Sequence, residues 1–134
     1  MFRRIDDHVL LSGQIGADDV AAAAAEGVTM IVNNRPDGEQ PGQPASADIE
    51  AAAKQAGMAY RYIPVRGGFS PEQVRAMAEA LSDGEGKVLA YCASGTRSAY
   101  LWALARASAG DDAEELVRKA AAAGYDLTPL LPYL

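Results

Sequence analysis

The stretch from Val88 to Ser98 constrains this chain more than any other, because it contains the only cysteine. It reads Val-Leu-Ala-Tyr-Cys-Ala-Ser-Gly-Thr-Arg-Ser. The apolar run that ends at Cys92 predicts a buried strand, and apolar residues at helical spacing after Arg97 predict a helix. A strand, a tight loop of small residues and a helix N-terminus together make a typical anion site. Backbone N–H groups and the helix dipole both favour negative charge there.

We expect Cys92 to be the nucleophile of this site. A thiol beside a helix N-terminus and an arginine ionises easily, and the thiolate is the reactive form. Arg97 supplies a planar guanidinium that suits phosphate, sulfate or thiosulfate oxygens. The backbone N–H groups expected to bind the anion are those of Ala93, Ser94, Gly95 and Thr96. Alternatively, Cys92 is a small buried apolar side chain. Ser98 either donates a hydrogen bond to the sulfur or is an ordinary helix-start hydroxyl.

Composition excludes several classes of function. A chain of 134 residues predicts one domain, spanning residues 1–134. No apolar run is long enough to cross a membrane, and the N-terminus is too polar for a signal peptide. A single cysteine cannot form an internal disulfide, which favours a reducing cytoplasm. The net charge of −6 argues against nucleic acid and anionic membranes as partners. With one histidine and one cysteine, we expect no metal and no other cofactor.

Strand and helix patterns alternate along the chain. We expect strands at 2–11, 28–32, 59–65 and 88–92, and helices at 17–26, 46–56, 71–81, 98–108 and 111–123. This order predicts an α/β fold with a largely parallel central sheet and helices on both faces. Trp102 is expected to pack in the core, and His8 to have no function. The apolar tail 127–134 must pack on the body or on a neighbour.

Two loops leave the carboxyl ends of predicted strands, the edge at which open α/β sheets bind ligands. The first, 33–44, has three prolines and two glycines and cannot form regular structure. Its polar residues face the site or form a solvated surface loop; they are Asn34, Arg35, Asp37 and Glu39. The second loop runs from Arg66 to Phe69.

Several pieces of the chain match one known pattern. They are Ser12-Gly-Gln14, Asn33-Asn-Arg-Pro-Asp-Gly-Glu39, Tyr62-Ile-Pro-Val65, Leu89-Ala-Tyr-Cys92 and Gly95-Thr-Arg-Ser98 through Leu104. They closely resemble the phosphatase-like domain family of the beta-lactamase-hydrolase-like proteins, over nearly the whole chain. The resemblance implies a fold like that of protein tyrosine phosphatases. Family members are also described as sulfur transferases, and some carry a fused metal-dependent dioxygenase that handles persulfides. These 134 residues contain no such domain.

Three positions depart from the patterns that this resemblance brings in. The family usually has an arginine directly after the nucleophile, where this chain has Ala93, so the anion site lacks one charge. Compared with tyrosine phosphatases, the loop from Cys92 to Arg97 is one residue shorter, and Tyr91 replaces the histidine before the cysteine. A loop of this length resembles that of rhodaneses.

Two chemistries and one non-catalytic role follow. Hydrolysis of a phosphate ester requires a general acid for the leaving group. The loop at Arg66 offers no carboxylate, so Asp37 or Glu39 would have to supply the proton. Transfer of sulfane sulfur from thiosulfate or a persulfide expels a good leaving group and needs no such acid. We therefore favour sulfur transfer through Cys92, with phosphatase activity as the alternative and a non-catalytic anion-binding module as the second alternative.

For sulfur transfer, we expect Arg97 and the loop N–H groups to bind the small anionic substrate. Arg35 or Arg66 would receive the remaining charge of the donor. The expected acceptor is a low-molecular-weight thiol such as glutathione.

Overall fold

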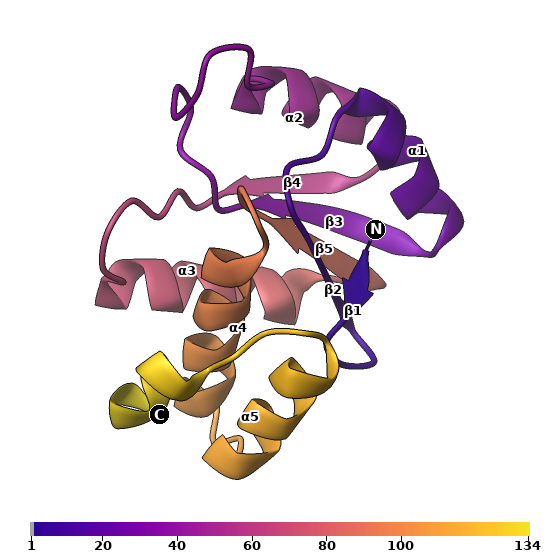
Figure 1. The fold of residues 1–134 in the computed structure, drawn as a ribbon. Coiled ribbons are helices and arrows are strands. Elements are labelled where there is room, and N and C mark those ends of the chain that lie inside the picture. Colours follow the sequence, from indigo (N-terminus) through magenta and orange to yellow (C-terminus); the bar gives the residue numbers. More distant parts are fainter. Residues whose placement is uncertain (1) are drawn as a thin grey trace.

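A five-stranded sheet forms the centre of the protein (Figure 1). The structure is a computed structural model and describes residues 2–134. The strands are β1 (Arg3–Arg4), β2 (Val9–Ser12), β3 (Val28–Asn33), β4 (Ala59–Tyr62) and β5 (Lys87–Tyr91). They lie in the order β1-β2-β5-β3-β4, and only β1 is antiparallel to its neighbour. The predicted α/β fold with a largely parallel sheet is confirmed.

Helices cover both faces of this sheet (Figure 1). On one face lie α1 (Ala17–Ala25) and α2 (Ser46–Gln55). On the other lie α3 (Pro71–Asp83), α4 (Thr96–Ser108) and α5 (Ala113–Ala122), followed by the 3₁₀ helix η1 (Thr128–Tyr133). The central strand β5 is buried along almost its whole length, because it is covered on both faces. The loop after it therefore starts from the most rigid part of the sheet.

The core on the α4 face contains the largest side chain of the protein. Trp102 is 0% exposed, and its indole N–H donates to the Asp6 carboxylate at 3.0 Å. The prediction that Trp102 packs in the core is therefore confirmed. The apolar tail packs on the body through Leu127 and Leu130, while Tyr133 is 74% exposed.

The predicted N-terminal strand 2–11 is wrong in its extent, since the structure divides it into β1 and β2. The carboxylate of Asp6 accepts hydrogen bonds from the backbone N–H groups of His8 and Val9, both at 2.7 Å. A short acidic side chain that binds the backbone two and three residues ahead stabilises a turn. The chain therefore reverses, and β2 becomes an inner strand between β1 and β5.

The helix α2 begins at residue 46, as predicted, whereas the start of α4 differs from the prediction. At α2 the capping acceptor is Asp37, whose carboxylate accepts the N–H of Ser46 at 2.8 Å, while the Ser46 hydroxyl pairs with Tyr60. At α4 the helix begins at Thr96, two residues before Ser98. At α3, Ser70 and Gln73 form a capping box.

Part of the predicted strand 59–65 lies beyond β4. Its last residues still follow the loop after β3, because Ile63 and Val65 donate their N–H groups to the carbonyls of Asn33 and Asn34. These bonds hold the two ligand-side loops next to each other. Among residues 2–134, no helix is long and apolar enough to cross a membrane.

Candidate functional site

The cysteine lies at the bottom of the loop between β5 and α4. Cys92 is 0% exposed, and its backbone N–H donates to the carbonyl of Ser12 on β2 at 3.3 Å. The N–H of Gly95 donates to Cys92 Sγ at 3.1 Å. Gly95 has φ +93°, a left-handed conformation that side chains with a Cβ rarely adopt. This turn directs a backbone donor at the sulfur.

Several backbone N–H groups of the same loop have no hydrogen-bond acceptor among the described residues. Within residues 2–134, no atom accepts a hydrogen bond from the N–H groups of Ala93, Ser94, Arg97 and Ser98. The last two belong to the first turn of α4, where helices leave N–H groups without intrahelical partners. The loop therefore offers unpaired donors at a helix N-terminus, which is the requirement for binding an anion.

Arg97 reaches from this helix to both neighbouring loops. Its guanidinium donates to Glu39 through two bonds of 2.8 and 2.9 Å, and to the carbonyl of Val65 at 2.7 Å. The hydrogen bond with Glu39 raises the pKa of Arg97 and outweighs the effect of burial, which lowers it. Arg97 is therefore fixed beside the cysteine as a permanent cation.

Glu39 has two cationic partners. Besides Arg97, it binds Arg35 Nε at 2.9 Å, and the Arg35 side chain is only 7% exposed. The hydrogen bond from Arg97, followed by that from Arg35, lowers the pKa of Glu39 to about 2. At neutral pH this carboxylate has no proton to give to a leaving group.

Arg35 is held on its other side by Gln14, whose side-chain oxygen accepts from Nη1 at 3.1 Å. Gln14 belongs to the turn after β2, and its N–H donates to the carbonyl of Ala93 at 3.4 Å. The turn packs so closely that a Cβ atom on Gly13 would lie 3.0 Å from the same carbonyl. The turn after β2 therefore supports both Arg35 and the cysteine loop.

Ser98 has a different partner from the one that the sequence suggested. Its hydroxyl donates to Asn34 Oδ1 at 2.8 Å, and both side chains are fully buried. The Asn34 amide donates in turn to the carbonyl of Ile63 at 3.0 Å. The hydroxyl proton of Ser98 is therefore directed at Asn34 and not at the sulfur, which was one of the two roles that the sequence left open. Ser98 instead joins α4 to the loop after β3.

Among the described residues, neither of the other two candidate residues forms a hydrogen bond or ion pair with Arg97. Asp37 is exposed, and its carboxylate caps α2 as described above. Arg66 is also exposed and directly follows Val65, whose carbonyl binds Arg97. Of the two acids considered for proton transfer, the structure thus brings Glu39 and not Asp37 to the arginine.

Tyr91 stands directly before the cysteine and is 1% exposed. Within residues 2–134 its hydroxyl is the one buried side-chain polar atom that forms no hydrogen bond. Burial raises the pKa of Tyr91, and the neighbouring Tyr60 raises it further. Tyr91 therefore stays a neutral phenol beneath the site.

Tyr125 is a residue near the site that the sequence did not indicate. A Cβ atom on Gly95 would collide with the Tyr125 hydroxyl oxygen and would lie 3.0 Å from its ring carbon Cζ. Burial raises the pKa of Tyr125, and the charge of Cys92 adds to that effect. Tyr125 lies between the last predicted helix and the apolar tail, and nothing at that position in the sequence identifies the loop that it contacts.

Chemically, this arrangement combines a buried thiol, backbone N–H donors without an acceptor and a fixed guanidinium. These are the parts that stabilise negative charge during group transfer to a thiolate. Within the part of the chain that the structure describes, no three His, Cys, Asp or Glu side chains are grouped to hold a metal ion.

The fold is phosphatase-like and is shared with solved protein tyrosine phosphatases such as Tk-PTP. Residues 1–109 match the family described as "Beta-lactamase hydrolase-like protein, phosphatase-like domain". The chain belongs to this family, and it is a phosphatase-like enzyme domain.

Three known proteins illustrate the similarity. A beta-lactamase hydrolase-like protein of Xylella fastidiosa (strain Temecula1) is 37% identical over 135 residues, which is 97% of this chain and 31% of that protein. The chain thus spans about a third of the length of this curated relative. A candidate phosphatase from Neisseria meningitidis, solved as a crystal structure, has a TM-score of 0.83 and 34% identity, covering 96% of this chain and 92% of that one. TpbA of P. aeruginosa, crystallised with pTyr, shares the fold with a TM-score of 0.65 and 20% identity, over 88% of this chain and 70% of that one.

Proposed function

We propose that this domain transfers sulfane sulfur through a persulfide on Cys92. The observation that carries the proposal is the ion pair of Glu39 with Arg97 and Arg35, which lowers the pKa of that carboxylate to about 2. The acid closest to the anion site is therefore ionised, and the loop after β4 contributes Arg66, Gly67 and Gly68 instead of a carboxylate. A reaction whose leaving group needs no proton fits this site best.

The first step with thiosulfate balances without an acid. The Cys92 thiolate attacks the outer sulfur, a new S–S bond forms on Cys92, and the old S–S bond breaks with its electron pair on sulfite. The charge is −3 on both sides, since a thiolate and a dianion become a persulfide anion and sulfite. In the second step a thiolate acceptor such as glutathione attacks the outer sulfur of the persulfide and releases the Cys92 thiolate.

Each charged group has a separate role in this proposal. The free N–H groups of the loop bind the sulfonate oxygens or the persulfide anion. Arg97 lies beside the sulfur and stabilises the charge that develops there. Arg35 is occupied by Glu39 and Gln14, so it positions Glu39. The exposed Arg66 is left to receive the outer charge of the donor.

Hydrolysis of a phosphate ester is the second candidate. It is favoured by the 34% identity to the candidate phosphatase from Neisseria meningitidis, and the same N–H cradle suits phosphate. The acid would then have to be Asp37, because Glu39 carries no proton at neutral pH. Asp37 would also have to leave its hydrogen bond with Ser46.

One experiment separates the two. The purified protein is incubated with thiosulfate or glutathione persulfide, and its intact mass is compared with that of Cys92→Ser and of Arg66→Gln. We expect one added sulfur atom in the wild type and none in Cys92→Ser, with transfer to cyanide or glutathione in a coupled assay. Arg66→Gln should raise KM more than it lowers kcat.

Phosphotyrosine peptide and aryl phosphate are assayed on the same preparations. Efficient phosphate release that depends on Cys92 and is lost in Asp37→Asn, with no sulfur on Cys92, would replace the proposal by the phosphatase function. Absence of both reactions, with anion binding retained, would leave the non-catalytic module.

A further inference from the structure

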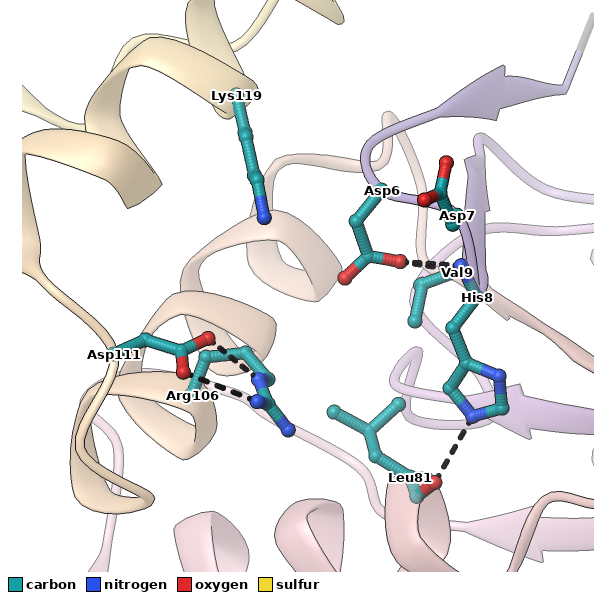
Figure 2. A pocket seen from close by; sticks show the side chains of 8 residues that line it. All are labelled: Asp6, Asp7, His8, Val9, Leu81, Arg106, Asp111 and Lys119. Atoms are coloured by element: carbon teal, nitrogen blue, oxygen red, sulfur yellow. Dashed lines mark hydrogen bonds and ion pairs between the residues drawn. The ribbon is translucent and has the colours of Figure 1, made fainter.

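A polar cavity lies at the opposite end of the sheet from Cys92. It has a volume of about 260 Å³ and is lined by residues of four elements or their connections, among them Asp6, His8, Leu81, Arg106, Asp111 and Lys119 (Figure 2). Arg106 stands in the last turn of α4, whose first turn carries Arg97. The two arginines are nine positions apart in the helix, which corresponds to roughly 14 Å along its axis. The cavity is thus distinct from the cysteine site.

Three carboxylates line this cavity, and each already has a partner; that of Asp7 is exposed and pairs with Arg4. One oxygen of Asp6 accepts from the N–H groups of His8 and Val9, and the other accepts from Trp102. Both oxygens of Asp111 accept from Arg106, at 2.8 and 3.1 Å. This pairing raises the pKa of Arg106 and lowers that of Asp111, so both groups stay charged.

Two cationic donors remain. Arg106 uses Nε and Nη2 on Asp111, and its Nη1 donates to no atom among residues 2–134. Lys119 forms no ion pair or side-chain hydrogen bond within the same residues. Figure 2 shows its ammonium directed into the space between Asp6 and the Arg106–Asp111 pair, with the third nitrogen of Arg106 directed away from Asp111.

His8 does not change this balance. Its Nε2 lies 3.0 Å from the carbonyl of Leu81 and must donate to it, since a carbonyl only accepts. The ring is therefore fixed on α3 and contributes no free acceptor through that atom. What the cavity offers a ligand is an ammonium and a guanidinium edge, both half-buried in a concave surface.

We propose that this cavity is a binding site for a small oxyanion of the phosphate or sulfate type, held between Lys119 Nζ and Arg106 Nη1. A guanidinium edge and a point-charge ammonium are the usual pair of phosphate-binding side chains. A cationic ligand would instead have to compete for carboxylates that already bind Arg106, Trp102 and the backbone. The proposal does not depend on the reaction at Cys92.

The single tryptophan gives a specific reporter. Its indole N–H binds the carboxylate of Asp6, which lines the cavity, so its ¹H–¹⁵N resonance senses this site. The amide of Gly95 senses the cysteine loop in the same spectrum. Inorganic phosphate is titrated into the labelled protein at constant ionic strength, and both resonances are followed. We expect saturable shifts at both, with two different dissociation constants.

The variants separate the two sites. Lys119→Met should weaken the indole response about tenfold, the loss expected for one charge-assisted hydrogen bond, and leave the Gly95 response unchanged. Lys119→Arg should restore it. The matched control is Arg118→Met, which removes an exposed cation that pairs with Glu115 on the same helix. An indole resonance that ignores phosphate while the Gly95 amide saturates overturns the proposal, and so does an equal response in Lys119→Met and the wild type.

Discussion

Glu39 and Arg97 are 58 residues apart in the chain and meet in an ion pair of two hydrogen bonds, at 2.8 and 2.9 Å. The carboxylate occupies the edge of the guanidinium that a substrate anion would otherwise contact. It also holds the arginine in one orientation, together with the carbonyl of Val65. The properties of the site therefore depend on this pair as much as on the cysteine.

The first prediction concerns acid. The folded-state pKa of Glu39, about 2, lies below its ordinary value of 4.5. The pair therefore contributes stability that is fully present above about pH 5 and is lost as the pH falls towards 2. Urea unfolding of the wild type should show this loss between pH 5 and 3. Glu39→Gln should be less stable at pH 7 and should show a smaller loss over that range. The exposed Glu85→Gln serves as the control and should behave like the wild type.

The second prediction concerns the shape of the cation. Lysine has one ammonium and cannot bind both oxygens of Glu39 and the carbonyl of Val65 in the same geometry. Arg97→Lys should therefore lower kcat/KM for thiosulfate by roughly 10²-fold, close to the effect of losing one oxyanion donor. Arg75→Lys on α3 is the matched conservative change outside the site. Full activity in Arg97→Lys would mean that only the charge of Arg97 matters.

The third prediction uses the position after the nucleophile. Ala93 is exposed, and its N–H belongs to the free donors of the loop. Ala93→Arg adds a cation next to the anion, so KM for thiosulfate should fall more than kcat changes. Ser94→Arg, one residue further along the loop, is the comparison. An unchanged KM in Ala93→Arg would show that this side chain points away from the donor.

The fourth prediction concerns Gly95. Alanine there meets a left-handed backbone, which costs about 1–2 kcal/mol, and it collides with Tyr125. Gly95→Ala should lower both stability and the alkylation rate of Cys92 by iodoacetamide. Combining it with Tyr125→Leu removes the collision and should restore part of the stability, because only the backbone strain remains. If the double variant is no more stable than Gly95→Ala, the contact with Tyr125 is unimportant.

The fifth prediction tests the role of Ser98. Removing its hydroxyl leaves the buried Asn34 oxygen without a partner, at a cost of about 1–3 kcal/mol. Ser98→Ala should therefore unfold at lower urea concentration, while its rate of Cys92 alkylation stays near that of the wild type. A large change in alkylation with unchanged stability would favour a direct bond to the sulfur.

The features that could be predicted from the sequence are those that depend on residues close to one another in the chain. The buried strand, the small residues and the glycine between Val88 and Ser98 specify strand, loop and helix N-terminus locally. Ser70 and Gln73 likewise specify the start of α3. The alternation of strand and helix patterns was sufficient to predict a largely parallel sheet with helices on both faces.

The features that could not be predicted depend on distant contacts. Glu39 lies in the predicted loop at the predicted edge of the sheet. Its ion pair with Arg97 could not be predicted, because it depends on how that loop folds back. The hydrogen bond of Ser98 to Asn34 could not be predicted either, because the two residues are 64 positions apart in the sequence. The turn at Asp6 competes locally with a strand pattern, and the hydrogen bonds of its carboxylate decided the outcome.

The contact between Tyr125 and Gly95 shows that residues near the C-terminus support the cysteine loop. The family match stops at residue 109, yet the side chain against the glycine of the cysteine loop comes from beyond it. That side chain is in turn held by the other end of the chain, because the guanidinium of Arg3 lies 5.8 Å from the Tyr125 ring centre and binds the carbonyl of Ala123. The family match therefore covers a shorter stretch of the chain than the residues that pack around the cysteine loop. Truncation after Ala109 would remove Tyr125, and a bulky N-terminal fusion could displace Arg3 from it. Either change would weaken the packing against Gly95 without altering any residue of the cysteine loop.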